Sequence, residues 1–229
     1  MGQRIRSVTV RPIRLTPTEA ELAVRVEVDT AAADAEVHGR LMGPRCRYGS
    51  TVEVAYPIRR LPPETGGPAA RLGKVLIPEP SWWDPESPFL YGGPVDLWEG
   101  GQSVEVVRVR CGLHHASAAG GRLIWNGRPL ELRAVVEAGV TRDQLAALRE
   151  SGVNLVVMPA DDLPGLWDEA DEVGILLAGA AADAAARAPA HPPLHHPSLL
   201  GFVGPAAGVR PLYVTGGRGM LELVAAGDG

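Results

Sequence analysis

The chain has 229 residues, of which 45% are hydrophobic and 21% charged, and this composition suits one large or two small globular domains. A formal net charge of -5 without a basic stripe argues against a nucleic-acid partner. No apolar run reaches the ~18 residues of a membrane span, and the N-terminal residues lack the apolar core of a signal peptide, so we expect a cytoplasmic protein that does not enter a membrane.

The first half of the chain is predicted to form short β-strands. Residues 22–28 alternate between apolar and polar side chains, which is typical of a half-buried strand. The pattern predicts further strands at 4–10, 37–42, 51–58, 72–77 and 104–109, with a Pro/Gly-rich loop at 62–68. About seven short strands within ~110 residues favour an immunoglobulin-like β-sandwich.

An aromatic segment rich in proline, WWDPESPFLY at 82–91, interrupts these strands. Its prolines restrict the backbone to an extended, turning path, and its rings are suited to anchoring that path on the sandwich. We therefore expect a structural role for Trp83 within the first domain.

The stretch LIWNGRPLELRAV at 123–135 marks a change in the hydrophobic period. Asn126-Gly127 is a hairpin-turn signal between two apolar runs. Strand-like alternation precedes this stretch, and short apolar strands alternating with helices follow it. We therefore expect a sandwich domain at 1–120 and a second domain at 121–229.

Two helices are predicted after this junction. The first begins with a capping box formed by Thr141 and Gln144 and ends near Gly152. The second has apolar side chains at helical spacing from Leu163 to Ala170 and ends at Gly174. Strands are expected at 153–158 and 175–178.

Several stretches resemble motifs of the family-2 glycoside hydrolases, the β-galactosidase, β-glucuronidase and β-mannosidase group. They are WDPESPFLY at 83–91, WNGRPLELRA at 125–134, LWDEADEVGI at 166–175 and HPSLLGF at 196–202. The resemblance implies an immunoglobulin-like sandwich joined to the first strand of a (β/α)8 barrel. It also implies a fourth barrel strand after His196 and a fifth at 212–215. Because far fewer residues follow the junction than the ~250 of a typical barrel, we expect a TIM-type α/β barrel truncated to about five strands.

The resemblance also indicates where catalytic groups are missing. It places the acid/base glutamate of an Asn-Glu pair after the fourth barrel strand, where counting from His196 reaches Ala206-Ala207. Alanine cannot donate a proton, and no Asp or Glu occurs between Asp183 and Glu222. Since retaining glycosidases need two carboxyl groups about 5–5.5 Å apart, we expect no catalytic residue and no hydrolysis by this chain alone.

Other carboxylates are candidates for a repurposed pair. Glu137 follows the first predicted barrel strand, and Asp161 and Asp162 follow the second, at the end where barrel enzymes keep their sites. The alternative is that Asp161 or Asp162 caps the next helix and that Glu137 is a solvated loop residue.

No metal and no cofactor are expected. His191, His195 and His196 lie close together in sequence, but adjacent side chains point apart and no Cys or acid accompanies them. Gly216 to Gly219 follow a strand, yet their spacing fits a flexible turn rather than a phosphate-binding loop.

Two functions remain open from the sequence. One is a non-catalytic carbohydrate-binding or protein-interaction module, for which exposed tryptophans would supply sugar platforms: Trp82, Trp83, Trp98 and Trp125. The other is a glycoside hydrolase subunit that needs a partner chain. An open barrel edge predicts self-association or a partner through the C-terminal half.

Overall fold

The structure is a computed structural model that describes residues 4–29, 34–61, 70–187, 194–204, 209–214 and 220–224. Two compact units make up the chain. The first comprises Met1–Ser81 and Phe89–Leu113, and the second comprises Trp82–Pro88 and His114–Gly229.

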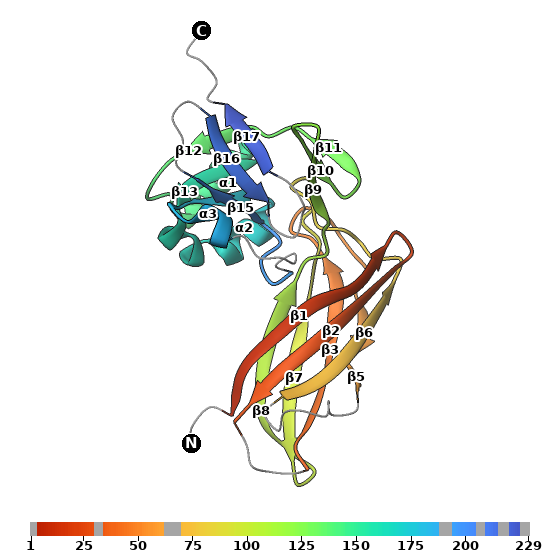
Figure 1. Ribbon diagram of the computed structural model, residues 1–229. Coiled ribbons are helices and arrows are strands. Elements are labelled where there is room, and N and C mark those ends of the chain that lie inside the picture. Colours follow the sequence, from red (N-terminus) through yellow and green to blue (C-terminus); the bar gives the residue numbers. More distant parts are fainter. Residues whose placement is uncertain are drawn as a thin grey trace. The chain divides into compact units, whose positions relative to one another are not determined.

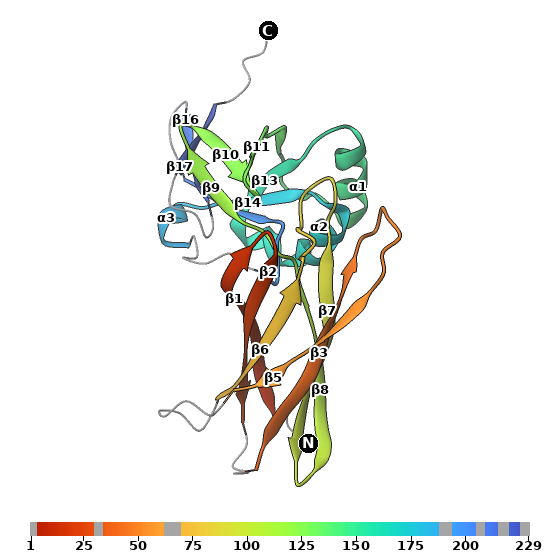
Figure 2. The same cartoon turned by 90° about the vertical axis from the view of Figure 1, so that its right-hand side faces the viewer.

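The described part of the first unit forms two four-stranded sheets in which all neighbouring strands are antiparallel (Figures 1 and 2). One sheet has the order β1-β2-β6-β5 and the other β4-β3-β7-β8. The strands are β1 (Ile5–Thr16), β2 (Glu19–Val28), β3 (Glu36–Arg45), β4 (Val54–Pro57), β5 (Arg59–Arg60), β6 (Ala70–Pro78), β7 (Leu90–Glu99) and β8 (Gln102–Cys111). The expected loop at 62–68 lies outside the described residues.

Alternating burial builds the core of the first unit. In β2 the side chains of Leu22, Val24 and Val26 are buried, and the residues between them face outward. Because successive side chains of a strand point to opposite faces, this pattern gives each sheet one apolar face. The strand predicted at 22–28 is confirmed.

Strand β7, which contains Gly92-Gly93-Pro94, was not predicted. The structure places it between β3 and β8. A Cβ at Gly93 would overlap the carbonyl oxygen of Arg40 on β3, so the close approach of these strands requires glycine there.

The second unit contains a three-stranded antiparallel sheet, a six-stranded sheet and short helices (Figure 1). Its strands are β9 (Ala116–Ala119), β10 (Arg122–Trp125), β11 (Arg128–Leu130), β12 (Ala134–Val136), β13 (Leu155–Pro159), β14 (Leu176–Ala180), β15 (Leu199–Val203), β16 (Val209–Val214) and β17 (Met220–Val224). Its helices are α1 (Arg142–Glu150), the 3-10 helix η1 (Ala160–Gly165), α2 (Trp167–Val173) and α3 (Ala184–Arg187).

The predicted hairpin turn is confirmed. Asn126 and Gly127 have φ values of 49° and 79°, as a type I′ turn requires, and they join β10 to β11. Strand β9 pairs with the other side of β10. The longer segment of the second unit begins at His114, before β9, whereas the expected boundary is at 121.

The six-stranded sheet is only partly parallel. Its order is β12-β13-β14-β15-β16-β17, and neighbours from β12 to β15 are parallel. The predicted fifth strand lies within β16 but runs antiparallel to β15, so the expectation of five parallel strands is wrong there. Only residues 204–208 separate these two strands, and a parallel neighbour needs a crossover of a dozen or more residues.

Both faces of the three parallel strands β13, β14 and β15 are largely buried, whereas the edge strand β12 is mostly exposed. In β13, Leu155, Val156, Val157 and Met158 are all at most 2% exposed, and most of β14 and β15 is also buried. This burial is normal for parallel strands. The apolar faces of these three strands are therefore covered. No helix in the described residues is long and apolar enough to cross a membrane.

The helix ends follow local sequence signals, with one correction. The capping box of α1 is confirmed, since the backbone N–H of Thr141 donates to Oε1 of Gln144 at 2.7 Å. The second predicted helix is instead two elements, η1 and α2, because Pro164 has no N–H to continue a helical ladder. Gly174 ends α2 with a φ of 77°, as expected.

Candidate functional site

The predicted carboxylates at the C-terminal ends of the parallel strands are exposed, and no contact joins them among the described residues. Glu137 follows β12 and is exposed, and no hydrogen bond or ion pair among the described residues joins it to Asp161 or Asp162. The Asp161 side chain is 92% exposed and lies 3.6 Å from the Arg187 guanidinium, which also pairs with Asp183 at 2.7 Å. Arg187, Asp161 and Asp183 therefore form a solvent-exposed cluster of ion pairs.

Neither Asp161 nor Asp162 caps a helix. Pro159 precedes the first residue of η1, and no side-chain hydrogen bond caps that helix. Both aspartates lie instead in its exposed first turn. Ala206 and Ala207, which take the acid/base position implied by the resemblance, lie outside the described residues.

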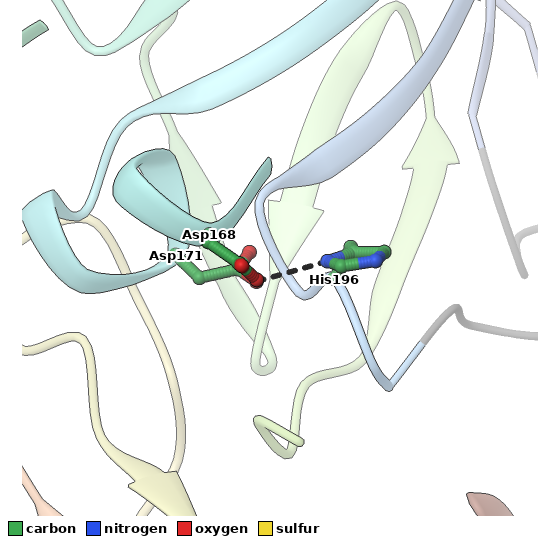
Figure 3. A group of neighbouring side chains, drawn as sticks. All are labelled: Asp168, Asp171 and His196. Atoms are coloured by element: carbon green, nitrogen blue, oxygen red, sulfur yellow. Dashed lines mark hydrogen bonds and ion pairs between the residues drawn. The ribbon is translucent and has the colours of Figure 1, made fainter. Parts of the chain in front are cut away.

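The structure brings together a polar cluster that the sequence did not predict. Asp171 on α2 is fully buried, and one carboxylate oxygen accepts hydrogen bonds from the backbone N–H of Ser198 at 3.0 Å and from its hydroxyl at 2.6 Å. The other oxygen lies 3.2 Å from Nδ1 of His196 (Figure 3). Asp168, one helical turn before Asp171, completes the group.

The geometry of this cluster is not that of a nucleophilic triad. Such a triad needs a histidine between the hydroxyl and the carboxylate, whereas here Asp171 lies between Ser198 and His196. The cluster links α2 to the turn before β15. The imidazole of His196 also stacks on the Trp167 indole, with ring centroids 4.4 Å apart.

Burial has the largest influence on the pKa of the Asp171 carboxyl. It raises the pKa of Asp171 above the usual value, against the opposing effect of the hydrogen bonds from His196 and Ser198. A buried carboxylate is stable only with such partners, so Ser198 and His196 are needed to hold Asp171 in place.

The segment 82–88 is anchored differently from our expectation. The indole N–H of Trp83 donates to the backbone oxygen of Asp171 at 2.8 Å. The carbonyl oxygen of Trp83 accepts from Nε1 of Trp125 at 3.1 Å and from Nδ2 of Asn126 at 2.9 Å. The prediction that these aromatics hold the segment to the sandwich is wrong for Trp83, because its partners all belong to the second unit.

Arg149 on α1 holds the same segment from another side. Its guanidinium donates to the carbonyl oxygen of Pro85, at 3.3 Å from Nε and 3.2 Å from a terminal nitrogen. Asp84 accepts from the backbone N–H groups of Glu86 and Ser87 and so closes the turn. Segment 82–88 is thus a structural part of the second unit.

The four tryptophans proposed as sugar platforms differ in how far they are buried. Trp83 is 0% and Trp125 4% exposed, and their rings pack edge to face, so neither presents a ring to a ligand. Trp82 and Trp98 are half-buried. Trp98 lies on the outward face of β7, with its ring centroid 5.1 Å from that of His38 on β3.

The sequence contained one signal for the Asp171 cluster. Asp171 and His196-Pro197-Ser198 both lie in stretches that resembled family motifs, but a resemblance of separate stretches does not state that they touch. His195 and His196 were considered together because they are adjacent, whereas His196 is paired with a residue 25 positions away. His191 lies outside the described residues.

Comparisons with known proteins agree on the fold. Residues 3–114 match the family model described as Glycosyl hydrolases family 2. A search of curated proteins gave no match.

Solved structures match across both units. A β-glucuronidase of Parabacteroides merdae has 20% identity and a TM-score of 0.57 over 77% of this chain and 23% of its own. The enzyme of Bacteroides uniformis has 17% identity and a TM-score of 0.58, covering 85% of this chain and 27% of its own. That of Bifidobacterium dentium, solved with coumarin-3-O-glucuronide, has 16% identity and a TM-score of 0.57, covering 76% and 30%.

Identities this low establish similarity of fold alone. The chain spans about a quarter of the length of these structures.

Proposed function

We propose that this chain is a degenerate member of glycosyl hydrolase family 2, whose family model matches residues 3–114. In this proposal the chain binds carbohydrate without hydrolysing it. In this proposal the first unit is an immunoglobulin-like sandwich, and the second is a truncated (β/α) barrel. Four parallel strands with helices between them support the barrel assignment.

The observation that carries the proposal is the missing carboxylate on the fourth parallel strand. Strand β15 and the residues around it contain no acid, since none occurs from position 184 to position 221. Hydrolysis of a glycoside requires one carboxyl group to protonate the leaving oxygen and a second to act as nucleophile or base. Exposed Glu137 and Asp161 do not replace such a pair.

Turnover of aryl glycosides tests this proposal. We expect the purified chain to release no phenol from aryl β-glucuronides, β-galactosides or β-mannosides above the rate in buffer. The matched variants are Glu137→Gln and Asp161→Asn, which remove a charge at exposed positions. Turnover by the wild type that either variant abolishes would overturn the proposal.

Trp98 is the tryptophan that best suits a carbohydrate platform. Its ring lies on an outward sheet face beside polar side chains, including His38 and Glu36 on β3. A pyranose presents C–H groups to an aromatic ring and hydroxyls to polar neighbours, so this combination fits a sugar. Trp82 is the second candidate, because it is half-buried.

A screen of immobilised glycans, followed by calorimetry on the ligands it detects, measures this binding. We expect Trp98→Ala to weaken binding about tenfold, or ~1.4 kcal/mol, without lowering the melting temperature. Val106→Ala, an exposed substitution on β8 of the same sheet, is the control. Unchanged affinity in Trp98→Ala would contradict the assignment of the platform.

A second candidate function, a glycosidase completed by a partner chain, is favoured by the edge strand β12. Glu137 donates its backbone N–H to Val157, and Arg133 accepts from Leu155, so the odd-numbered residues face β13. By alternation, the N–H and C=O groups of Ala134 and Val136 point toward the open edge. Within the described residues no strand pairs there, and Val136 is 68% exposed.

Light scattering on the purified chain tests whether this edge associates. We expect self-association at micromolar concentration, and we expect Val136→Lys to weaken it at least tenfold, because a charged edge opposes strand pairing. Val52→Lys is the control, because Val52 of the first unit is a still more exposed valine, at 85% against 68% for Val136. A monodisperse monomer would rule out self-association and leave a partner chain as the remaining form of this idea.

A further inference from the structure

We propose that Asp168, Asp171 and His196 form a binding site for a divalent transition-metal cation such as Zn²⁺. One donor atom from each residue lies within 4.8 Å of the others. Figure 3 shows both carboxylates of α2 pointing toward the imidazole from the turn before β15. Two carboxylate oxygens and one imidazole nitrogen are a donor set that suits Zn²⁺ or Mn²⁺.

The spacing of the two inner donors fits a common ion. Nδ1 of His196 and one carboxylate oxygen of Asp171 are 3.2 Å apart. Ligands at about 2.0–2.2 Å from a metal, at tetrahedral or octahedral angles, stand roughly 3.0–3.5 Å from each other. The ion therefore replaces the direct contact without requiring the helix and the turn to move apart.

Asp168 supplies the third donor from the same face of the helix. Residues three apart on a helix are neighbours, so the two aspartates project to one side of α2. Asp168 is exposed, Asp171 is buried and His196 is half-buried. The site is thus open to solvent on the Asp168 side, which gives an ion a route of entry.

Surrounding residues already orient the proposed ligands. Ser198 donates twice to the oxygen of Asp171 that faces away from His196, so the other oxygen is held toward the site. Trp167 stacks on the imidazole of His196. Such support of metal ligands by hydrogen bonds and packing is typical of metal sites, where its loss weakens affinity 10–100-fold.

A purely structural cluster would show the same contacts between Asp171, Ser198 and His196. The proposed metal site differs from such a cluster because it also uses Asp168, which takes no part in the hydrogen bonds to Ser198. Substitution of Asp168 therefore separates the two explanations, because it removes a ligand and leaves the link between α2 and β15 intact.

Calorimetric titration of the full chain with Zn²⁺ tests the proposal. We expect one ion per chain, and a loss of affinity of at least tenfold in Asp168→Asn and in His196→Gln. Asp162→Asn is the matched control, because it removes the same charge from an exposed aspartate of η1 outside the cluster. Melting temperatures measured with chelator establish that each variant folds.

Two results would overturn the proposal. One is the absence of Zn²⁺ and Mn²⁺ binding by the wild type. The other is equal affinity in the wild type and Asp168→Asn, which would show that Asp168 is not a ligand of the ion. Neither result bears on carbohydrate binding, which is measured separately with chelator present.

Discussion

The two units of this chain depend on different kinds of contact. In the first unit, backbone ladders between antiparallel strands determine the fold, and the alternating side chains fill the space between two sheets. In the second unit, single buried side chains join segments far apart in the chain: Trp83 reaches Asp171 across 88 positions, and Asp171 reaches Ser198 across 27. Single substitutions should therefore have larger and more local effects in the second unit.

The largest expected effect is that of Trp83→Ala. This fully buried indole packs against Trp125 and donates a hydrogen bond to α2, so its removal should destabilise the second unit by about 3–5 kcal/mol. From the sequence we expected the sandwich to be destabilised instead. Denaturant unfolding followed by hydrogen exchange resolves the two units.

Trp82→Ala is the control for this substitution, since Trp82 is adjacent but only half-buried. If Trp83→Ala instead weakened protection in β2 and β7 and spared β13 and β14, the contrast between the units would be wrong.

A smaller effect is expected from Asn154→Ala. The Asn154 side chain accepts from the backbone N–H of Arg133 and donates to the carbonyl oxygen of Glu131, both at 2.7 Å. It thereby holds residues 131–133, which lead into β12, beside the start of β13. Loss of both bonds at a largely buried position should cost about 1–3 kcal/mol in the free energy of unfolding.

Asn154→Asp refines this measurement. An aspartate still accepts from Arg133 but cannot donate to Glu131 when ionised, so its unfolding free energy should fall between those of the wild type and Asn154→Ala. Chemical denaturation measures all three. Equal stability of the wild type and Asn154→Ala would show that these hydrogen bonds contribute nothing.

The smallest expected effect is a pH dependence from Asp171. Because burial raises the pKa of its carboxyl in the folded protein, the folded state holds this proton more tightly than the unfolded chain. The resulting stabilisation is complete below the unfolded value of about 3.8 and is lost as the pH rises through the folded pKa. The melting-temperature difference, wild type minus Asp171→Asn, should therefore fall with rising pH.

Melting curves from about pH 3.5 to about pH 7 in the presence of chelator give this difference. A difference that stays constant or increases with pH would contradict the effect of burial on Asp171.

The two units also differ in how well their elements could be predicted. Strand β2, the Asn126-Gly127 turn, the capping box of α1 and the end of α2 at Gly174 were all predicted, because each depends on neighbours within a few residues. Strand β7 was missed, because the need for glycine at position 93 arises from Arg40 on another strand.

The candidate site was less accessible to prediction than the fold. The absence of a carboxylate after the fourth strand is visible in the chain itself, since it depends only on which residues are present. The burial of Trp83 and Trp125, which removes two of four proposed sugar platforms, depends on packing that their sequence context does not specify.

The sequence by itself determined many of the periodic elements, the turns that join them and the absence of Asp and Glu from position 184 to position 221, because these follow from residue identity and local spacing. Tertiary structure alone decided that segment 82–88 packs within the second unit, and that Asp168, Asp171 and His196 converge. The physical reason is that both outcomes depend on contacts between distant segments. Hydrogen bonds to Trp83 and Asp171 form only when the parallel strands and α2 bring those segments together.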